Sequence, residues 1–106
     1  TIEDFCEMIK ELVNLIGEDN IGIGSDLCLN WPDDVVMWMR NGKWTKNIDY
    51  GESKDKNPKW PKLPSWYKQP SDLNNLFYLM CENNIPEKVS TKIIGQNWFN
   101  FMKNQF

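Results

Sequence analysis

A single candidate β-strand, at residues 20–25, is the feature that most constrains the fold of this chain. The sequence Asn-Ile-Gly-Ile-Gly-Ser alternates large and very small side chains, which is typical of a strand. Its glycines weaken the strand and indicate that another part of the molecule approaches the backbone closely. Because buried backbone groups without partners are costly, a lone strand indicates that the chain is not a self-sufficient fold.

The N-terminal half is otherwise expected to contain two helices. Apolar residues recur with helical spacing over residues 2–16. Thr1 and Asp4 approximate a capping box at the start of this helix, and Gly17 is expected to end it in a left-handed conformation. A second helix is expected to begin at 32–34, where a proline and two acids favour a helix N-terminus, and to stop before Gly42.

The C-terminal part is expected to contain three helices. The first begins at Ser71 and ends at Asn83, and the second runs from Pro86 to Gly95. Asn97 is expected to be the N-cap of the last helix. Residues 43–69 form a long irregular stretch rich in proline and aromatic residues, which predicts an ordered lid packed by its own aromatics. A polyproline recognition ligand, from the pattern W-P-K-L-P-S-W-Y, is the alternative for this stretch.

Composition limits the classes of function. The length of 106 residues fits one small domain and excludes a complete (β/α)₈ barrel. The net charge is −3 and Arg40 is the only arginine, which argues against a nucleic-acid partner. No apolar stretch is long enough to span a membrane. The N-terminal residues lack the pattern of a secretory signal, so a cytoplasmic location is favoured over secretion, although the compartment stays unassigned.

The residues that could carry chemistry are few. The chain has no histidine, which excludes Ser-His-Asp triads, Cys-His pairs and histidine-bearing metal sites within it. Cys6, Cys28 and Cys81 are odd in number and widely spaced, so reduced, packed thiols are expected in place of disulfides or a structural zinc site. Phosphate binding is not expected, because G-I-G-S-D lacks the third glycine of a dinucleotide motif.

Asp26 is the carboxylate that stands out. It follows the predicted strand at its C-terminal end, where parallel α/β barrels carry catalytic groups. An aspartate there can accept a proton from a metal-bound water or ligate a metal, and a turn or capping aspartate is the alternative. Asp33 and Asp34 are expected to stabilise the N-terminus of their helix.

Three motifs together resemble the C-terminal end of the membrane dipeptidase family, the zinc-dependent dipeptidases of peptidase family M19 that include renal dipeptidase. These are G-E-D-N-I-G-I-G-S-D-L, the stretch W-M-R-N-G-K-W-T at 38–45, which is similar to the bacterial branch, and I-I-G-Q-N-W-F-N-F near the end. The resemblance covers essentially the whole chain.

The resemblance implies a (β/α)₈ barrel with a two-zinc site, of which this chain would be the last strand, its preceding helix and the C-terminal helices. The zinc ligands would come from earlier strands, so zinc is expected in the full-length parent and no cofactor is expected on this chain. Asp26 matches the acid beside the metal site. The residues that match structural positions are Gly22, Gly24, Ser25, Gly95 and Asn97. The family pattern G-x-D-F/Y-D-G is not kept, since Ser25 to Leu29 lack the second acid and its glycine, which leaves the substrate open.

The sequence thus predicts a mostly α chain with one short β-strand, the C-terminal portion of a (β/α)₈ metal-dependent hydrolase barrel. Residues 1–106 would form a single partial domain, with the last barrel strand at 20–25, the loop at 43–69 and helices at 71–106. The parent would cleave a small dipeptide or amide, and the isolated chain would be inactive. The alternative is a stand-alone helical interaction module.

Self-association is also expected, because the lone strand has unpaired edges and two helices should expose apolar faces. The residues expected on those faces are Phe5, Ile9 and Leu12 on the first helix and Trp98, Phe101 and Met102 on the last.

Overall fold

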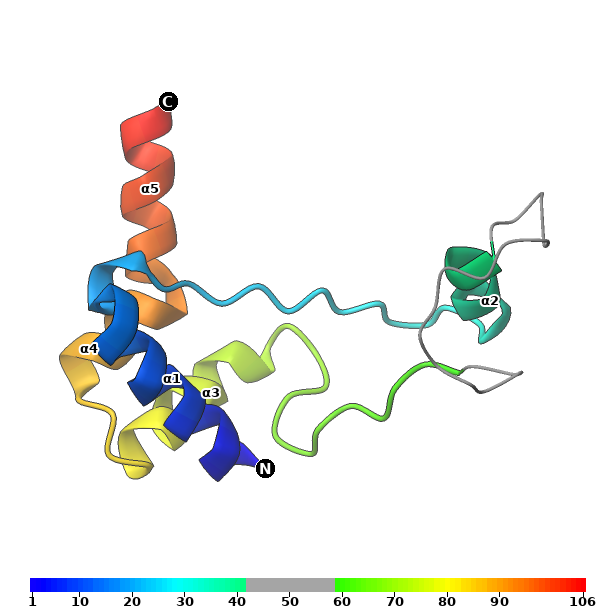
Figure 1. Ribbon diagram of the computed structural model, residues 1–106, viewed down its shortest axis with the longest axis horizontal. Helices are drawn as coiled ribbons and strands as arrows, with labels where there is room; N and C mark the ends of the chain where they lie inside the picture. The colour runs from blue at the N-terminus through cyan, green and yellow to red at the C-terminus, as the bar shows by residue number, and fades with distance from the viewer. Residues whose placement is uncertain (42–58) are drawn as a thin grey trace. The chain divides into compact units, whose positions relative to one another are not determined.

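The computed structural model describes residues 1–41 and 59–106, and its contacts divide the chain into two units (Figure 1). The first unit comprises Thr1–Leu27 and Pro64–Phe106, and the second comprises Cys28–Leu63. Every regular element in the described residues is helical. In chain order they are α1 (Ile2–Ile16), η1 (Glu18–Asn20), α2 (Asp34–Asn41), α3 (Asp72–Glu82), α4 (Glu87–Thr91), η2 (Lys92–Gln96) and α5 (Asn97–Gln105).

The first helix forms as its sequence predicts. Thr1 accepts a hydrogen bond from the Asp4 amide at 3.2 Å and the Asp4 carboxylate reaches back to Thr1, which completes the capping box. The helix ends at Gly17, whose φ of 85° is positive and whose ψ of 150° is extended and not left-handed helical. Glycine adopts this conformation at no steric cost, and the chain therefore turns into η1 directly after α1.

The core of the first unit lies between α1, α3, α4 and η2. Its buried side chains are Cys6, Ile9, Ile21, Leu76, Met80, Ile85, Val89 and Ile93. Ser90 is fully buried as well, and its hydroxyl donates to the Ile85 carbonyl at 3.4 Å. Phe5 and Leu12 pack against this core, so the expectation that they and Ile9 are exposed is wrong.

The end of the proline-rich stretch also packs on this core. Trp66 and Tyr67 are half-buried, and the Trp66 ring centroid lies 5.1 Å from that of Phe5. This part of the stretch is therefore ordered by its aromatic side chains. Residues 42–58, which include most of the predicted lid, lie outside the described residues.

The predicted strand is not formed, and the prediction of a mostly α fold with one β-strand from a (β/α)₈ barrel is contradicted. Ile21 has the extended conformation expected of it, with φ −115° and ψ 132°. Residues 22–28 carry no regular structure, and no strand in the described residues pairs with them. Local side-chain alternation favours an extended backbone, but a strand requires hydrogen bonds from a neighbouring strand.

The second unit contains α2. Its first turn begins as predicted: the amide of Val35 donates to the Pro32 carbonyl at 3.2 Å, and that of Val36 donates to the Asp33 carbonyl at 3.1 Å. The indole of Trp60 donates to the same Pro32 carbonyl at 3.1 Å, and thereby ties residues on both sides of 42–58 together within this unit.

The C-terminal helices form one continuous helical run from Glu87 to Gln105. The predicted break at Gly95 is absent, because Gly95 lies inside η2 and the helix passes through it as a π-helical turn. Beyond this turn, α5 carries the C-terminus away from the other helices of the first unit (Figure 1).

Candidate functional site

The π-helical turn of η2 brings the polar side chains of Lys92 and Asn97 onto one side of the helix. The amide of Asn97 donates to the carbonyl of Lys92, five residues earlier, which defines the turn. Five residues of a regular α-helix would place these side chains about 140° apart. The wider turn instead lets both side chains reach the η1 region.

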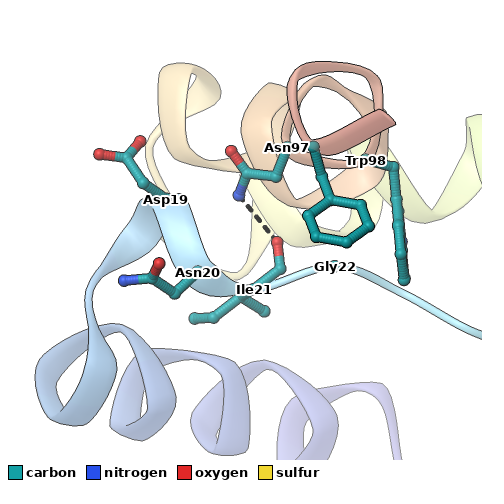
Figure 2. Close-up of a pocket in the computed structure, with 7 residues that line it drawn as sticks. Asp19, Asn20, Ile21, Gly22, Asn97 and Trp98 are labelled. Carbon is teal, nitrogen blue, oxygen red and sulfur yellow. Dashed lines mark hydrogen bonds between the residues drawn. The ribbon is translucent and has the colours of Figure 1, made fainter. Parts of the chain in front are cut away.

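Asn97 binds the main chain on both sides of Asn20. Its side-chain amide donates to the Glu18 carbonyl at 2.7 Å. It also donates to the Ile21 carbonyl at 2.8 Å (Figure 2). Its own backbone is helical, so it does not act as the N-cap that its position suggested. Asn97 therefore holds the turn that leads from α1 into the extended segment.

Trp98 belongs to α5, and its indole ring packs on the extended segment. Its indole Nε1 donates to the Ile23 carbonyl at 3.0 Å. A Cβ atom built on Gly22 would lie 2.5 Å from the same Nε1, so only glycine allows the ring to lie where it does (Figure 2). The close approach indicated by the two glycines exists at Gly22 and not at Gly24, which has nothing within 4 Å of such a Cβ.

Lys92 adds an ion cluster to this junction. Its ammonium contacts Asp19 at 2.7 Å and Glu18 at 2.5 Å. Hydrogen bonds to the Asp19 and Glu18 carboxylates raise the pKa of Lys92 above its ordinary value. Together, Lys92, Asn97 and Trp98 fix residues 18–23 to the C-terminal helix through two ion pairs and three hydrogen bonds.

A hollow of about 340 Å³ lies at this junction. It is lined by Asp19, Asn20, Ile21, Gly22, Asn97, Trp98 and Phe101. The side chains of Asp19 and Asn20 are already engaged, since Asp19 binds Lys92 and Asn20 donates to the Ile16 carbonyl at 2.6 Å. The hollow therefore offers mainly the aromatic faces of Trp98 and Phe101 and the backbone of Gly22.

Asp26 lies outside this hollow, three residues beyond Ile23. It is exposed and has a φ of 47°, in the left-handed region that non-glycine residues seldom adopt. The Leu27 amide donates to the hydroxyl of Ser25 at 3.4 Å, which is a weak contact across the turn at Asp26. The structure thus brings Gly22 and Asn97 together and leaves Gly24, Ser25 and Asp26 farther along the segment.

Gly95 occupies a different environment. It is half-buried in η2, and a Cβ atom there would have nothing within 4 Å. No close approach therefore requires a glycine at this position.

Sequence reasoning missed the roles of Lys92 and Trp98. The glycine at position 22 signalled that something approaches the backbone, but it did not identify Trp98 as the neighbour. The link to Lys92 depends on the π-helical turn, for which the sequence Lys92–Gln96 shows no recognisable signal.

Comparisons with protein-family models, with curated proteins and with solved structures found no match to this chain. In residues 1–41 and 59–106, no three His, Cys, Asp or Glu side chains are grouped so that they could hold a metal ion. None of the helices in these residues combines the length and apolar character needed to cross a membrane.

Proposed function

We propose that this chain is the C-terminal part of a metal-dependent hydrolase similar to the membrane dipeptidases, and that it is catalytically silent by itself. The observation that supports this is a contact between two of the three motifs that carry the resemblance. Asn97 and Trp98, from I-I-G-Q-N-W, bind the carbonyls of Ile21 and Ile23, from G-I-G-S-D. Motifs about 75 residues apart in the chain thus form one junction.

This junction supports a role for Asp26 at the edge of an active site in the parent. The backbone is held at Ile21 and Ile23, and the exposed carboxylate of Asp26 lies three residues beyond the held segment. A carboxylate in such a position can take up a proton and deliver it to the leaving amine of a small dipeptide or related amide.

The residues present do not themselves fit a zinc site. The chain has no histidine, and the described acids and thiols form no group of three. In this proposal, the two zinc ions and their ligands belong to parts of the parent outside these 106 residues, and Asp26 contributes only proton transfer.

The first test is an assay of the 106-residue chain against a panel of dipeptides, with and without added zinc. We expect no hydrolysis in either condition, since the metal ligands are missing. Zinc-dependent turnover by the purified chain would refute the proposal. The reading frame upstream of Thr1 gives a second test, because the proposal requires it to continue and to encode a His-x-Asp pair.

The second test is Asp26→Asn in the full-length parent. Loss of a general acid or base lowers kcat by about 10²-fold or more, and the fold should stay intact because Asp26 is exposed. Asp33→Asn is the matched control, since Asp33 is also exposed and is expected to act only at the start of α2. Equal kcat values for the two variants would refute the catalytic role and show that Asp26 is only a turn residue.

A stand-alone helical interaction module is the second candidate, and one observation favours it. The last helix has no buried residue, and its aromatic side chains are exposed. A start codon immediately before Thr1 in the source gene would favour this function over the hydrolase.

A further inference from the structure

The last helix, α5, has no fully buried residue, and its apolar face is largely exposed except where the Trp98 ring lies on residues 22–23. Three side chains of α5 form it, at helical spacing: Trp98 is 44% exposed, Phe101 57% and Met102 49%. Phe106 follows α5 directly, its amide donates to the Met102 carbonyl at 3.1 Å, and its side chain is 104% exposed. As sequence analysis expected, the first three are exposed. This face borders the hollow, since Trp98 and Phe101 belong to both.

We propose that a second copy of this chain covers the face, with the two α5 helices antiparallel about a two-fold axis near Met102. In this arrangement, Phe106 of each copy lies opposite Trp98 of the other, because both residues are four positions from Met102. An eight-residue separation along a helix is about 12 Å. The Phe106 ring of one copy then reaches the hollow of the other.

Self-complementarity favours a second copy over an unrelated partner. A two-fold interface requires each copy to supply both halves of every contact. The C-terminal segment carries a fully exposed aromatic ring at Phe106, directly after α5, and borders a hollow of about 340 Å³ at Trp98. Each copy thus has both a projecting ring after α5 and a hollow formed between α5 and residues 19–22.

The exposed area sets the upper limit of such an interface. An aromatic side chain carries about 150–250 Å², so the four exposed fractions amount to about 500 Å² in each copy. If all of this area were covered, two copies would bury at most about 1,000 Å², which is the lower limit for a specific interface, so a weak dimer is expected. The charges allow it as well: Lys103 is the only charged residue of α5, and antiparallel helices oppose their dipoles favourably.

Sedimentation equilibrium of the 106-residue chain, from about 1 to 200 µM, tests the proposal over the range expected of a small interface. We expect the 12.6 kDa chain to dimerise as its concentration rises. Met102→Asp should weaken the dimer about 10-fold or more, because it places a charge at the axis. Leu15→Asp is the matched control, since Leu15 is 79% exposed on α1 and lies off this face.

Phe106→Ala tests the filling of the hollow separately. Phe106 is fully exposed, so its loss should leave the helical circular dichroism of the monomer unchanged while weakening the dimer. In a mixed labelled sample, isotope-filtered NMR should show contacts between the Trp98 indole and the Phe106 ring of the other copy. A chain that stays monomeric throughout, or equal dimerisation by the Leu15 and Met102 variants, would overturn the proposal.

Discussion

Replacement of Gly22 by alanine tests the contact on which the candidate site depends. The new Cβ would lie 2.5 Å from Nε1, 2.9 Å from Cε2 and 3.0 Å from Cδ1 of Trp98. Ordinary non-bonded contacts are about 3.5–4.0 Å, so the ring must move by about 1 Å. Such a shift disrupts the 3.0 Å hydrogen bond to the Ile23 carbonyl.

The expected cost follows from these two changes. Overpacking costs about 1–3 kcal/mol, and a lost hydrogen bond costs about 1 kcal/mol. Alanine also restricts the unfolded chain, which returns about 0.4–1 kcal/mol. We therefore expect Gly22→Ala to lower the free energy of unfolding by about 1–3.6 kcal/mol. Gly24→Ala, where nothing lies within 4 Å of the Cβ, should be neutral or stabilising by up to about 1 kcal/mol.

Urea unfolding followed by far-ultraviolet circular dichroism measures both variants. Hydrogen exchange of the Trp98 indole, assigned by its loss in Trp98→Leu, should accelerate in Gly22→Ala only. The leucine side chain also relieves the steric conflict, so Gly22→Ala should cost little in a Trp98→Leu background, as a double-mutant cycle would show. Equal stabilities of the two alanine variants, with unchanged indole exchange, would refute this reasoning.

Three further predictions concern the surroundings of the site and the start of α3. Because folding raises the pKa of Lys92, its stabilising contribution is complete below pH 10.5 and is lost as the pH rises beyond that value. In urea titrations, Lys92→Arg should therefore lose less stability at alkaline pH than the wild type, because its guanidinium stays charged. The pKa of Asp72 is lowered, chiefly by the hydrogen bond from the Lys68 amide, so the stability difference between the wild type and Asp72→Asn should shrink as pH falls below 3.8. Gly95→Ala should raise the melting temperature, since the Cβ has room and alanine is favoured over glycine in helices by up to about 1 kcal/mol; a lower melting temperature would show that the π-helical turn needs glycine.

Helices with local determinants were predictable from sequence. The capping box at Thr1 and Asp4 and the proline-acid start of α2 both involve residues within a few positions of one another, and both form. The exposure of the apolar face of α1 was not predictable, because it depends on whether a distant segment covers it. Here, Phe5 meets Trp66, which is 61 residues away.

The candidate site was predictable only in part, for the same reason. Gly22 indicated a close approach, and the approach exists. The neighbour could not be identified, because Trp98 lies 76 residues beyond Gly22 and meets it only through the tertiary packing of α5. The role expected for Asn97 as a cap assumed a helix that begins there, whereas the helix begins earlier and frees its side chain to bind Glu18 and Ile21.

The failure of residues 20–25 to form the predicted strand and the need for glycine at position 22 have one physical explanation. An extended segment can satisfy its carbonyls with a neighbouring strand or with side chains, and here α5 supplies side chains, through Asn97 at Ile21 and Trp98 at Ile23. The indole that binds the Ile23 carbonyl here lies across the preceding residue, which leaves no room for a Cβ at Gly22. The alternation of large and very small residues that resembles a strand therefore also suits a segment held by the side chains of a helix, because both arrangements need an extended backbone and close approach on one side.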